Sequence, residues 1–427
     1  MEIYVVQPGD TIYSIARKYQ ISAEEIIRDN ELTDPENLVV GQTIVILKPE
    51  IVYTVMEGDT LYQIADQYDV SVVNLYQNNP SLQSRTELQP GEQLVIKYQT
   101  DKLGYASVIG YAYPYINIET LLKTLPYLTY LSLFTYGFTA DGGLITIEDQ
   151  ELINLALDYG VAPIMMLSPL DEQGQFSNQR ASELLNNQEA QETLIQNILG
   201  ALYEKGYQGV ELDFEYILPE DKDEFINFIN QLRKRLNAEG YFVNVDLAPK
   251  TSGTMTGLLY EAHDYGAIGA AANNVLLMTY EWGYMYGPPM AVAPINNVRK
   301  VLDYAVTEID PYKIFMGINN YGYDWPLPFE KGVTAASTIG NVEAVDLARQ
   351  YGVAIQYDEV SQAPYFNYTT EEGIQHVVWF EDARSMEARL KLVNEYDING
   401  VGYWNIMKFF PQNWLVLNSM YDIRKVI

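Results

Sequence analysis

The stretch GVELDFEY at residues 209–216 sets three acidic side chains at alternate positions of an otherwise apolar run. Alternate side chains of a β-strand point to the same side, so Glu211, Asp213 and Glu215 are predicted to share one face. Carboxylates are costly to bury without partners. The stretch therefore predicts a strand whose acidic face serves a chemical purpose and whose apolar face packs against helices.

Similar apolar runs occur on both sides of this stretch, and helical patterns separate them. The eight expected strands cover residues 107–113, 129–136, 162–167, 209–216, 242–248, 275–281, 314–320 and 400–405. The helices expected between them include residues 148–159, 191–204, 221–239, 297–309 and 385–396. Such alternation over about 320 residues predicts an α/β fold, a (β/α)8 TIM barrel with its active site at the carboxyl ends of the strands. Glu215, the last acid of its strand, is expected there.

The last two expected barrel strands lie about 80 residues apart, which is too long for a single crossover connection. Three β-rich runs fall in this interval, VAIQYDE (353–359), PYFNYT (364–369) and HVVWFED (376–382). We therefore expect an α+β insertion between strands 7 and 8 of the barrel, at about residues 321–385.

The N-terminal part of the chain contains a repeat of about 50 residues. YVVQPGDTIYSIARKY (4–19) returns as YTVMEGDTLYQIADQY (53–68), and GQTIVI (41–46) returns as GEQLVI (91–96). Each copy is typical of a strand, a Gly-Asp turn, two capped helices and a closing strand, which is a βααβ unit. Only residues 98–103 separate the second copy from the barrel, too few for a flexible tether, so we expect both units to lie close to the barrel.

Composition excludes several classes of function. The chain has 57 acidic and 26 basic residues and a net charge of −31, so we expect no nucleic-acid partner and no binding to anionic membranes. The absence of cysteine excludes disulfides, thiolate metal sites and cysteine nucleophiles. Two histidines, His263 and His376, form no ligand cluster, and we expect neither a metal nor another cofactor. The start MEIYVVQPGD lacks the features of a signal peptide, and no apolar run is long enough to span a bilayer.

The two repeats resemble LysM modules in their Gly-Asp-Thr turn, their Ile-Ala-x-x-Tyr helix, the Asn after the second helix and the closing strand. The modules are expected at residues 2–48 and 51–98. LysM modules bind glycans that contain N-acetylglucosamine, such as peptidoglycan and chitin, and the alternative is a pair of protein-binding modules. The resemblance implies one glycan groove per module, formed in part by Asp10, Thr11, Asn30, Asp59, Thr60 and Asn79. Alternatively, the two threonines only cap helices.

Residues 104–427 resemble glycoside hydrolase family 18, whose fourth strand carries the signature D-x-x-D-x-D-x-E. The corresponding residues here are Gln208, Glu211, Asp213 and Glu215. The last two positions therefore match the signature, and the first two depart from it. These departures bear on the proton relay that the signature implies among its acids, and they bear less on Glu215 as the acid.

Two further motifs of the same family occur later in the chain. LLMTYEWG (276–283) resembles the M-x-Y-D motif of the sixth strand, with Met278 and Tyr280 kept and Glu281 in place of Asp. GVGYWN (400–405) supplies Trp404, which matches the tryptophan that floors the sugar pocket in the family.

The resemblance implies hydrolysis of a glycosidic bond with retention, assisted by the substrate. Glu215 would protonate the leaving oxygen and later activate water, while the 2-acetamido oxygen of the sugar attacks the anomeric carbon. Asp213 and Tyr280 would orient that acetamido group. Crowded carboxylates raise one another's pKa, which suits Glu215 as an acid near neutral pH. The residues expected to bind the substrate are Trp404, Glu211, Met278, Glu281 and Tyr136.

The tandem modules and the divergent fourth strand together resemble the spore cortex-lytic N-acetylglucosaminidases of endospore formers. That resemblance implies cleavage of GlcNAc–muramic bonds in spore cortex peptidoglycan, with peptidoglycan as the partner. The missing signal fits a protein laid down in the spore coat or cortex from within the mother cell. Two alternatives stay open: a chitinase acting on chitin oligomers, and a non-catalytic glycan-binding coat protein.

Overall fold

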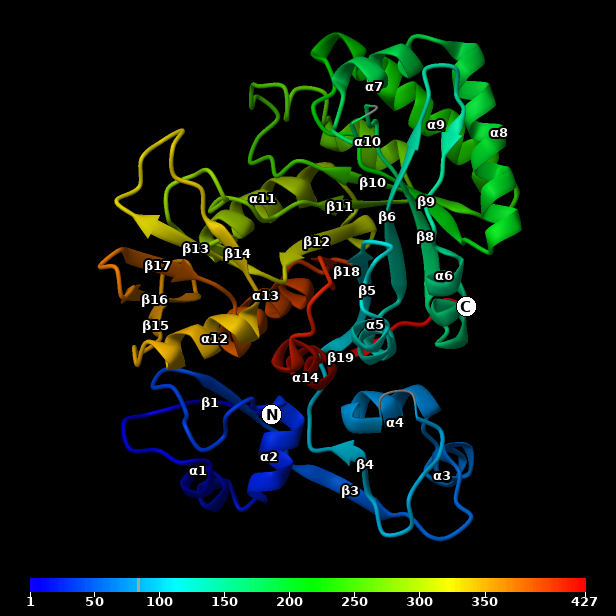
Figure 1. Cartoon of the computed structure of the whole chain (residues 1–427). Helices are drawn as coiled ribbons and strands as arrows, with labels where there is room; N and C mark the ends of the chain where they lie inside the picture. The colour runs from blue at the N-terminus through cyan, green and yellow to red at the C-terminus, as the bar shows by residue number, and fades with distance from the viewer. Residues whose placement is uncertain (83–84, 172) are drawn as a thin grey trace.

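The centre of the molecule is a barrel of parallel strands with helices around it (Figure 1). The computed structural model describes residues 1–82, 85–171 and 173–427. In order around the barrel, the strands are β5 (Gly104–Ala112), β6 (Tyr130–Phe138), β8 (Ala162–Leu167), β9 (Gly209–Leu212), β10 (Phe242–Leu247), β11 (Asn274–Leu277), β12 (Ile314–Asn319) and β18 (Gly400–Trp404). Because β5 pairs with both β18 and β6, the sheet closes on itself. The predicted eight-stranded TIM barrel is confirmed.

The helices bury an apolar stripe against the outside of the barrel. In α9 this stripe consists of residues at helical spacing, Phe225, Phe228, Ile229, Leu232 and Leu236. The main outer helices are α5 (Ile118–Thr124), α6 (Gln150–Asp158), α8 (Gln188–Lys205), α9 (Lys222–Ala238), α10 (Tyr265–Ala271), α11 (Ile295–Glu308), α13 (Ala383–Glu395) and α14 (Pro411–Met420). Within the described ranges, no helix combines the length and the hydropathy needed to cross a membrane.

Strand β9 is shorter than the sequence pattern predicts. The expected strand covered residues 209–216, but the ladder to β10 ends at the pair Leu212 and Val245. Tyr216 has a φ of 57°, in the left-handed region that strand residues do not adopt. Glu211 therefore lies on the strand, whereas Glu215 lies in the turn that follows it.

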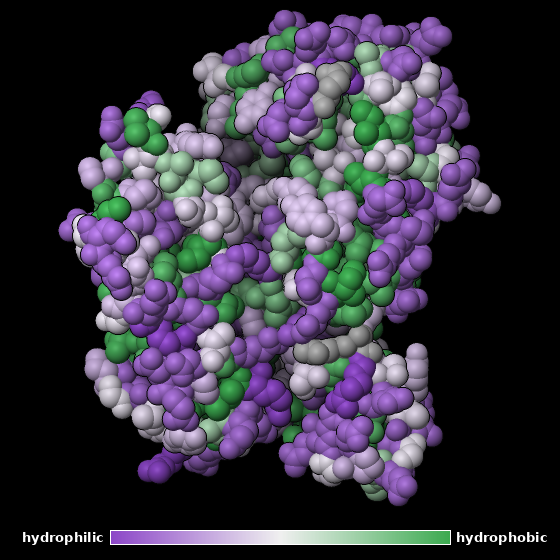
Figure 2. Space-filling view, viewed as in Figure 1, coloured by the Kyte–Doolittle hydropathy of each residue, from purple (hydrophilic) through white to green (hydrophobic). Residues whose placement is uncertain are grey.

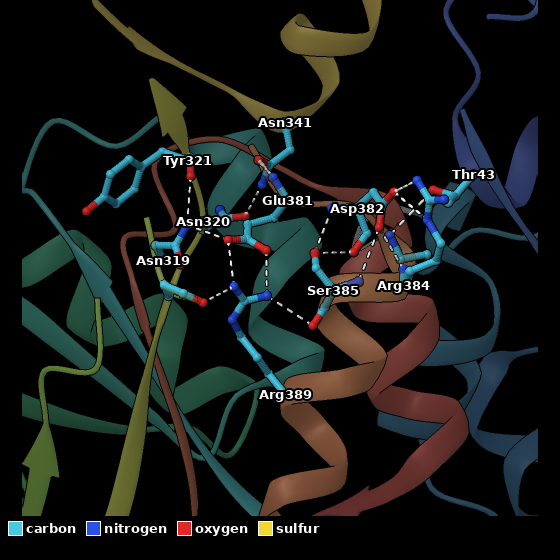
Figure 3. Close-up of polar contacts among 12 residues, drawn as sticks. Thr43, Asn319, Asn320, Tyr321, Asn341, Glu381, Asp382, Arg384, Ser385 and Arg389 are labelled. Atoms are coloured by element: carbon cyan, nitrogen blue, oxygen red, sulfur yellow. Dashed lines mark hydrogen bonds and ion pairs between the residues drawn. The ribbon is translucent and has the colours of Figure 1, made fainter. Parts of the chain in front are cut away.

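Between β12 and β18 the chain forms the predicted α+β insertion. Its antiparallel sheet has the order β14 (Ser337–Ile339), β13 (Gly322–Leu327), β17 (Gln375–Trp379), β16 (Ala363–Thr369) and β15 (Gln356–Asp358), and helix α12 (Asn341–Gln350) joins β14 to β15. A buried ion pair at its base links Glu381 to Arg389 of α13, with distances of 2.6 and 3.0 Å (Figure 3). Asn319 at the end of β12 donates a hydrogen bond to the same carboxylate at 3.0 Å.

Two small βααβ units precede the barrel. Module 1 comprises β1 (Glu2–Val5), α1 (Ile12–Tyr19), α2 (Ala23–Asn30) and β2 (Thr43–Ile46); module 2 comprises β3 (Pro49–Thr54), α3 (Leu61–Gln67), α4 (Val72–Asn78) and β4 (Gln93–Tyr98). In each unit a Thr caps the first helix and a Ser caps the second.

Both modules pack against the rest of the molecule, as the short connection predicts. The Thr43 hydroxyl of module 1 donates to Gln412 of α14 at 2.7 Å, and Gln412 donates back to the Thr43 carbonyl at 2.6 Å. In module 2, the side-chain amide of Gln77 donates to the Pro126 carbonyl at 2.8 Å. The main-chain carbonyl of Gln77 accepts from the Tyr127 hydroxyl at 2.9 Å. Figure 2 shows hydrophilic residues over much of the face in view, including the modules.

Candidate active site

Five acidic side chains meet at the carboxyl ends of barrel strands β9, β10 and β11, or just beyond them: Glu211, Asp213, Glu215, Asp246 and Glu281. A cavity of about 150 Å³ opens beside them. Its lining consists of Asp213, Glu215, Asp246, Glu281, Tyr280, Met278, Trp404, Tyr111, Phe134, Met166 and Phe176. The structure therefore brings together the expected residues from the fourth, sixth and eighth barrel strands.

Glu211 is completely buried next to the cavity and does not line it. Tyr111 donates a hydrogen bond to its Oε1 at 2.9 Å, and Ser132 donates to its Oε2 at 2.6 Å. The carboxyl of Asp246 is also hydrogen-bonded to Glu211. Because two carboxyl groups in such contact must share a proton, one of them acts as the donor.

Asp246 is the acid that keeps this proton. Burial, followed by the charges of Glu211 and Asp213, holds the pKa of Asp246 well above its usual range. A neutral Asp246 donates to Glu211, which already accepts from two hydroxyls. The arrangement lets the site hold several acids without several negative charges.

Asp213 lies between the buried acid and the cavity. Burial raises its pKa well above the usual range, and the charges of Glu215 and Glu211 add to the effect. No group among the described residues forms a hydrogen bond with its Oδ1. The surroundings of Asp213 thus favour its protonated form, and one of its oxygens has no hydrogen-bond partner among the described residues.

Glu215 is half-buried, and its environment suits proton transfer. Burial raises the pKa of its carboxyl to about 7, the negative charge of Glu281 adds to the effect, and a hydrogen bond from Tyr216 opposes it. A carboxyl with this pKa is protonated in about half of the molecules at pH 7, so it can both give and take a proton there. Arrangement and protonation therefore make Glu215 the strongest candidate for an acid/base.

Tyr280 and Glu281 follow strand β11 and reach the cavity from its other side. Tyr280 is buried, and desolvation, followed by the charges of Asp246 and Asp213, holds the pKa of its phenol well above the usual range. The phenol is therefore a hydrogen-bond donor. Glu281 is solvent-exposed and accepts hydrogen bonds from Tyr321 and, at 3.1 Å, from Tyr323 of the insertion. The insertion thus contributes directly to the wall of the site.

Aromatic rings line the site and also line a larger cleft that continues from it. Trp404 packs edge-on against Phe134, with ring centroids 5.1 Å apart, and lies 6.0 Å from Tyr113. A second cavity of about 410 Å³ begins at Trp404 and Glu281 and continues between the barrel and the insertion. It is lined further by Tyr113, Tyr115, Asn320, Tyr321, Tyr323, Thr338, Ile339, Asn405, Met407 and Lys408. Flat aromatic surfaces with polar groups at their edges suit the faces and hydroxyls of sugar rings.

The prediction that Tyr136 lines the groove is wrong. Tyr136 is completely buried. Its hydroxyl donates to Asp149 and accepts from Lys205 of α8 at 2.8 Å, so its side chain points outward from the barrel toward the helices. The strand register shifts between Leu133 and Tyr136, and this irregularity reverses the alternation that the sequence suggests. The β6 side chains that face the site are Ser132 and Phe134.

The expected sugar ligands of the two modules are occupied in holding the modules together. The side chain of Asn30 donates to the carbonyls of Ile26 and Val45 and accepts from the Val45 amide, all within 3.0 Å. Asn79 makes the same three bonds in module 2. Both asparagines are buried, which contradicts their expected role as glycan ligands.

The Asp and Thr residues of the two turns also make contacts within the modules. Asp10 accepts from the Tyr4 hydroxyl and the Gln7 amide, and Asp59 repeats this pattern in module 2. Thr11 and Thr60 cap the first helices, which was the alternative reading of these threonines. Glycan contacts of Asp10, Thr11, Asp59 and Thr60 stay predictions.

Sequence reasoning missed Asp246, Ser132, Tyr321 and Tyr323. Asp246 carried a usable signal, because it is an acid near the carboxyl end of the apolar run 242–248, as Asp213 is in its own run. The two insertion tyrosines carried none, because their approach to Glu281 depends on how the insertion folds back over the barrel.

Comparisons with known proteins agree with this geometry. The family described as "Glycosyl hydrolases family 18" matches residues 173–408, and the LysM domain matches residues 4–47 and 53–97. The cortical fragment-lytic enzyme of Bacillus subtilis (strain 168) is 40% identical over 432 residues, which cover 100% of this chain and 99% of that protein.

Solved structures give the same result. The crystal structure of the Bacillus megaterium QM B1551 spore cortex-lytic enzyme SleL has a TM-score of 0.85 and 40% identity, over 100% of this chain and 99% of that one. A chitinase from Chromobacterium violaceum ATCC 12472 has a TM-score of 0.69 and 26% identity, over 74% of this chain and 98% of that one. The chain therefore belongs to glycosyl hydrolases family 18, and it is a glycoside hydrolase with two LysM domains.

Proposed function

We propose that this glycoside hydrolase cleaves GlcNAc–muramic bonds of spore cortex peptidoglycan and acts on fragments of that polymer. The observation that carries the proposal is the Glu215 carboxyl, with a pKa of about 7, beside Asp213 and Tyr280 in a cavity that Trp404 also lines. Full-length similarity to cortical fragment-lytic enzymes supports the choice of substrate.

The proposed reaction proceeds with retention and with help from the substrate. Glu215 gives its proton to the glycosidic oxygen as the bond to the anomeric carbon breaks. The acetamido oxygen of the same sugar forms the new bond to that carbon and yields an oxazolinium ion. Glu215, now a carboxylate, takes a proton from water as the water opens this ring, which restores the acid.

Asp213 and Tyr280 are proposed to orient the acetamido group. The raised pKa of Tyr280 keeps its phenol protonated, so it is a donor for the acetamido oxygen. The oxygen of Asp213 without a protein partner is an acceptor for the acetamido N–H. The Asp213 contact becomes stronger as positive charge develops on the acetamido N–H, which is the condition for lowering the barrier, while Tyr280 fixes the direction of the oxygen before it attacks.

The two modules are proposed to hold the enzyme on the glycan of the spore wall. Next to the Gly-Asp-Thr turn, each module presents an exposed tyrosine, Tyr13 and Tyr62, and these are repeat equivalents. We propose that the protein resides in the spore, laid down from the mother cell, because its full-length relatives include spore cortex-lytic enzymes.

A chitinase is the second candidate. The observation that favours it is the similarity of the barrel to the Chromobacterium violaceum chitinase. Both substrates offer the same acetamido sugar to Glu215, so they differ only in the neighbouring residue of the glycan.

The test compares Glu215→Gln with the control Glu220→Gln on cortex fragments and on chitin oligomers. Glu220 is an exposed acid outside the cavity, so its variant undergoes the same chemical change away from the site. Loss of the general acid is expected to lower kcat by about 10²- to 10⁴-fold, while the control retains full activity. Mass spectrometry of reduced products should find GlcNAc at the new reducing ends. Muramic reducing ends would contradict the proposed bond, and preferential turnover of chitin would establish the second candidate.

A further inference from the structure

The main chain that carries Asp213 and Glu215 separates from β10 before it reaches these two acids. The ladder between β9 and β10 ends at Leu212 and Val245. On the β8 side one more bond follows, from the Asp213 amide to the Leu167 carbonyl at 3.0 Å. On the β10 side, the segment Asp213–Glu215 has no ladder to hold it.

The imidazole of His263 fills this gap between the two strand ends. Its Nδ1 accepts a hydrogen bond from the Ala248 amide at 2.9 Å, just beyond β10. Its Nε2 lies 3.1 Å from the carbonyl oxygen of Phe214, the residue between Asp213 and Glu215. The ring thus makes one bond to each strand end, as a main-chain rung of the sheet would.

The two contacts fix the state of the ring. A backbone amide can only donate, so Nδ1 is the acceptor and Nε2 carries the proton that it donates to Phe214. The ring is completely buried, and burial lowers its pKa to about 4, with the charge of Lys250 acting in the same direction. The imidazole is therefore neutral at the pH at which Glu215 titrates.

The ring is itself held in place on both sides. It packs on Phe225, with centroids 6.5 Å apart, and Phe225 stacks on Phe214 at 5.5 Å. Lys250 is buried, and its Nζ donates to the carbonyls of His263 and Tyr260 at 2.9 and 3.0 Å. A ring immobilised in this way can fix the position of the chain that it contacts.

We propose that His263 is a positioning residue for the catalytic segment, because its imidazole replaces a missing rung between β9 and β10 and sets the place of Asp213 and Glu215. This inference rests on the proposed function of Glu215. It differs from a purely stabilising role because the two nitrogens do separate work: Nδ1 holds Ala248, while only Nε2 reaches the segment that carries the acids.

Two substitutions separate the nitrogens. In His263→Gln the amide nitrogen can reach the place of Nε2 and donate to Phe214, whereas in His263→Asn the amide oxygen can accept from Ala248 but nothing reaches Phe214. We expect kcat of His263→Asn to fall about 10- to 100-fold, since an ångström-scale displacement of a catalytic group has effects of that size. Its KM should change little, because Trp404 and the cleft are untouched. His263→Gln should keep most of the wild-type kcat.

Thermal unfolding of both variants provides the control for stability. Equal loss of kcat in the two variants, or losses that follow their melting temperatures, would overturn the inference and leave His263 a structural residue. Full activity of His263→Asn alongside an inactive Glu215→Gln would also overturn it, with the proposed function intact. Full activity of Glu215→Gln would instead overturn the proposed function.

A measurement on the unaltered chain tests the same contact if a variant does not fold. The chain has only two histidines, so ¹⁵N-histidine labelling gives the Nδ1 and Nε2 signals of two rings, and His376→Asn shows which pair belongs to His263. We expect His263 to show the neutral tautomer with the proton on Nε2 between pH 5 and 7. A proton on Nδ1, or a charged ring at pH 6, would disprove the proposed bond to Phe214.

Discussion

Glu381 and Glu211 are both buried acids near the same cleft, but their partners differ. Glu381 faces the guanidinium of Arg389 in a two-pronged ion pair (Figure 3). Glu211 faces two hydroxyls and the neighbouring acid Asp246, and no Lys or Arg of the described residues forms an ion pair with it. A paired buried charge holds structure together, whereas crowded acids without a cation keep protons that chemistry can use.

The largest effect is expected where the paired acid loses its partner. Arg389→Met leaves the Glu381 carboxylate buried and unpaired and should cost about 3–5 kcal/mol of unfolding free energy, measured in urea. The matched control is Arg299→Met, which breaks the exposed pair with Glu395 and should cost less than about 1 kcal/mol because water screens that pair. Equal losses in the two variants would show that burial is not what distinguishes them.

The crowded acids should show themselves in the pH dependence of activity. Glu215 must be protonated to act as an acid, so kcat/KM is expected to fall about tenfold per pH unit above its pKa of about 7. Tyr216→Phe removes the hydrogen bond that lowers this pKa, so the alkaline limb of the profile should move to higher pH. If the alkaline limb does not move in Tyr216→Phe, the group that titrates in the profile is not Glu215.

At pH 8, Asp246→Asn should raise the unfolding free energy, whereas Arg389→Met should lower it. The folded-state pKa of Asp246 is raised, so folding retains a proton that the unfolded chain releases, and this costs stability at high pH. An Asn amide can donate to Glu211 in place of the acid without that cost. The variant should therefore be more stable than wild type at pH 8, and the difference should shrink as the pH falls toward about 4, the pKa of an unfolded Asp. A difference independent of pH would show that Asp246 is ionised in the folded protein.

The smallest effect is expected at Tyr136, whose hydroxyl contacts the paired acid Asp149. Tyr136→Phe should cost about 1 kcal/mol of unfolding free energy for the lost hydrogen bond. Its kcat and KM should equal those of the wild type. A raised KM for cortex fragments would return Tyr136 to the sugar-binding site.

The barrel could be predicted from sequence because each strand and helix carries its own periodic pattern. The alternation of residues 209–216 also correctly indicated that Asp213 and Glu215 face a common cavity. It did not indicate where β9 ends, since this depends on where neighbouring strands diverge. The prediction that Tyr136 binds the substrate was wrong for a related reason. A local register shift turns its side chain to the other face of the strand, and an alternating sequence pattern does not reveal such a shift.

The partners of the site residues could not be read from the sequence. His263, Tyr321 and Asp246 lie far from Glu215 along the chain and reach the site only through the closure of the barrel and the folding of the insertion. The asparagines of the modules failed for another reason. Asn30 sits at the position where a sugar ligand is expected, but its amide is used by the closing strand of its own module.

The contacts of Asn319 and Arg389 with Glu381 have a consequence for chain entropy. They fix together the entry and the exit of the insertion, so its base is closed by a buried junction. The entropy cost of a closed loop grows only with the logarithm of its length. Residues can therefore be added to or removed from the insertion beyond this junction at little cost to the barrel. The outer part of the insertion can thus vary in length, while Tyr321 and Tyr323 near its start keep their contacts with Glu281.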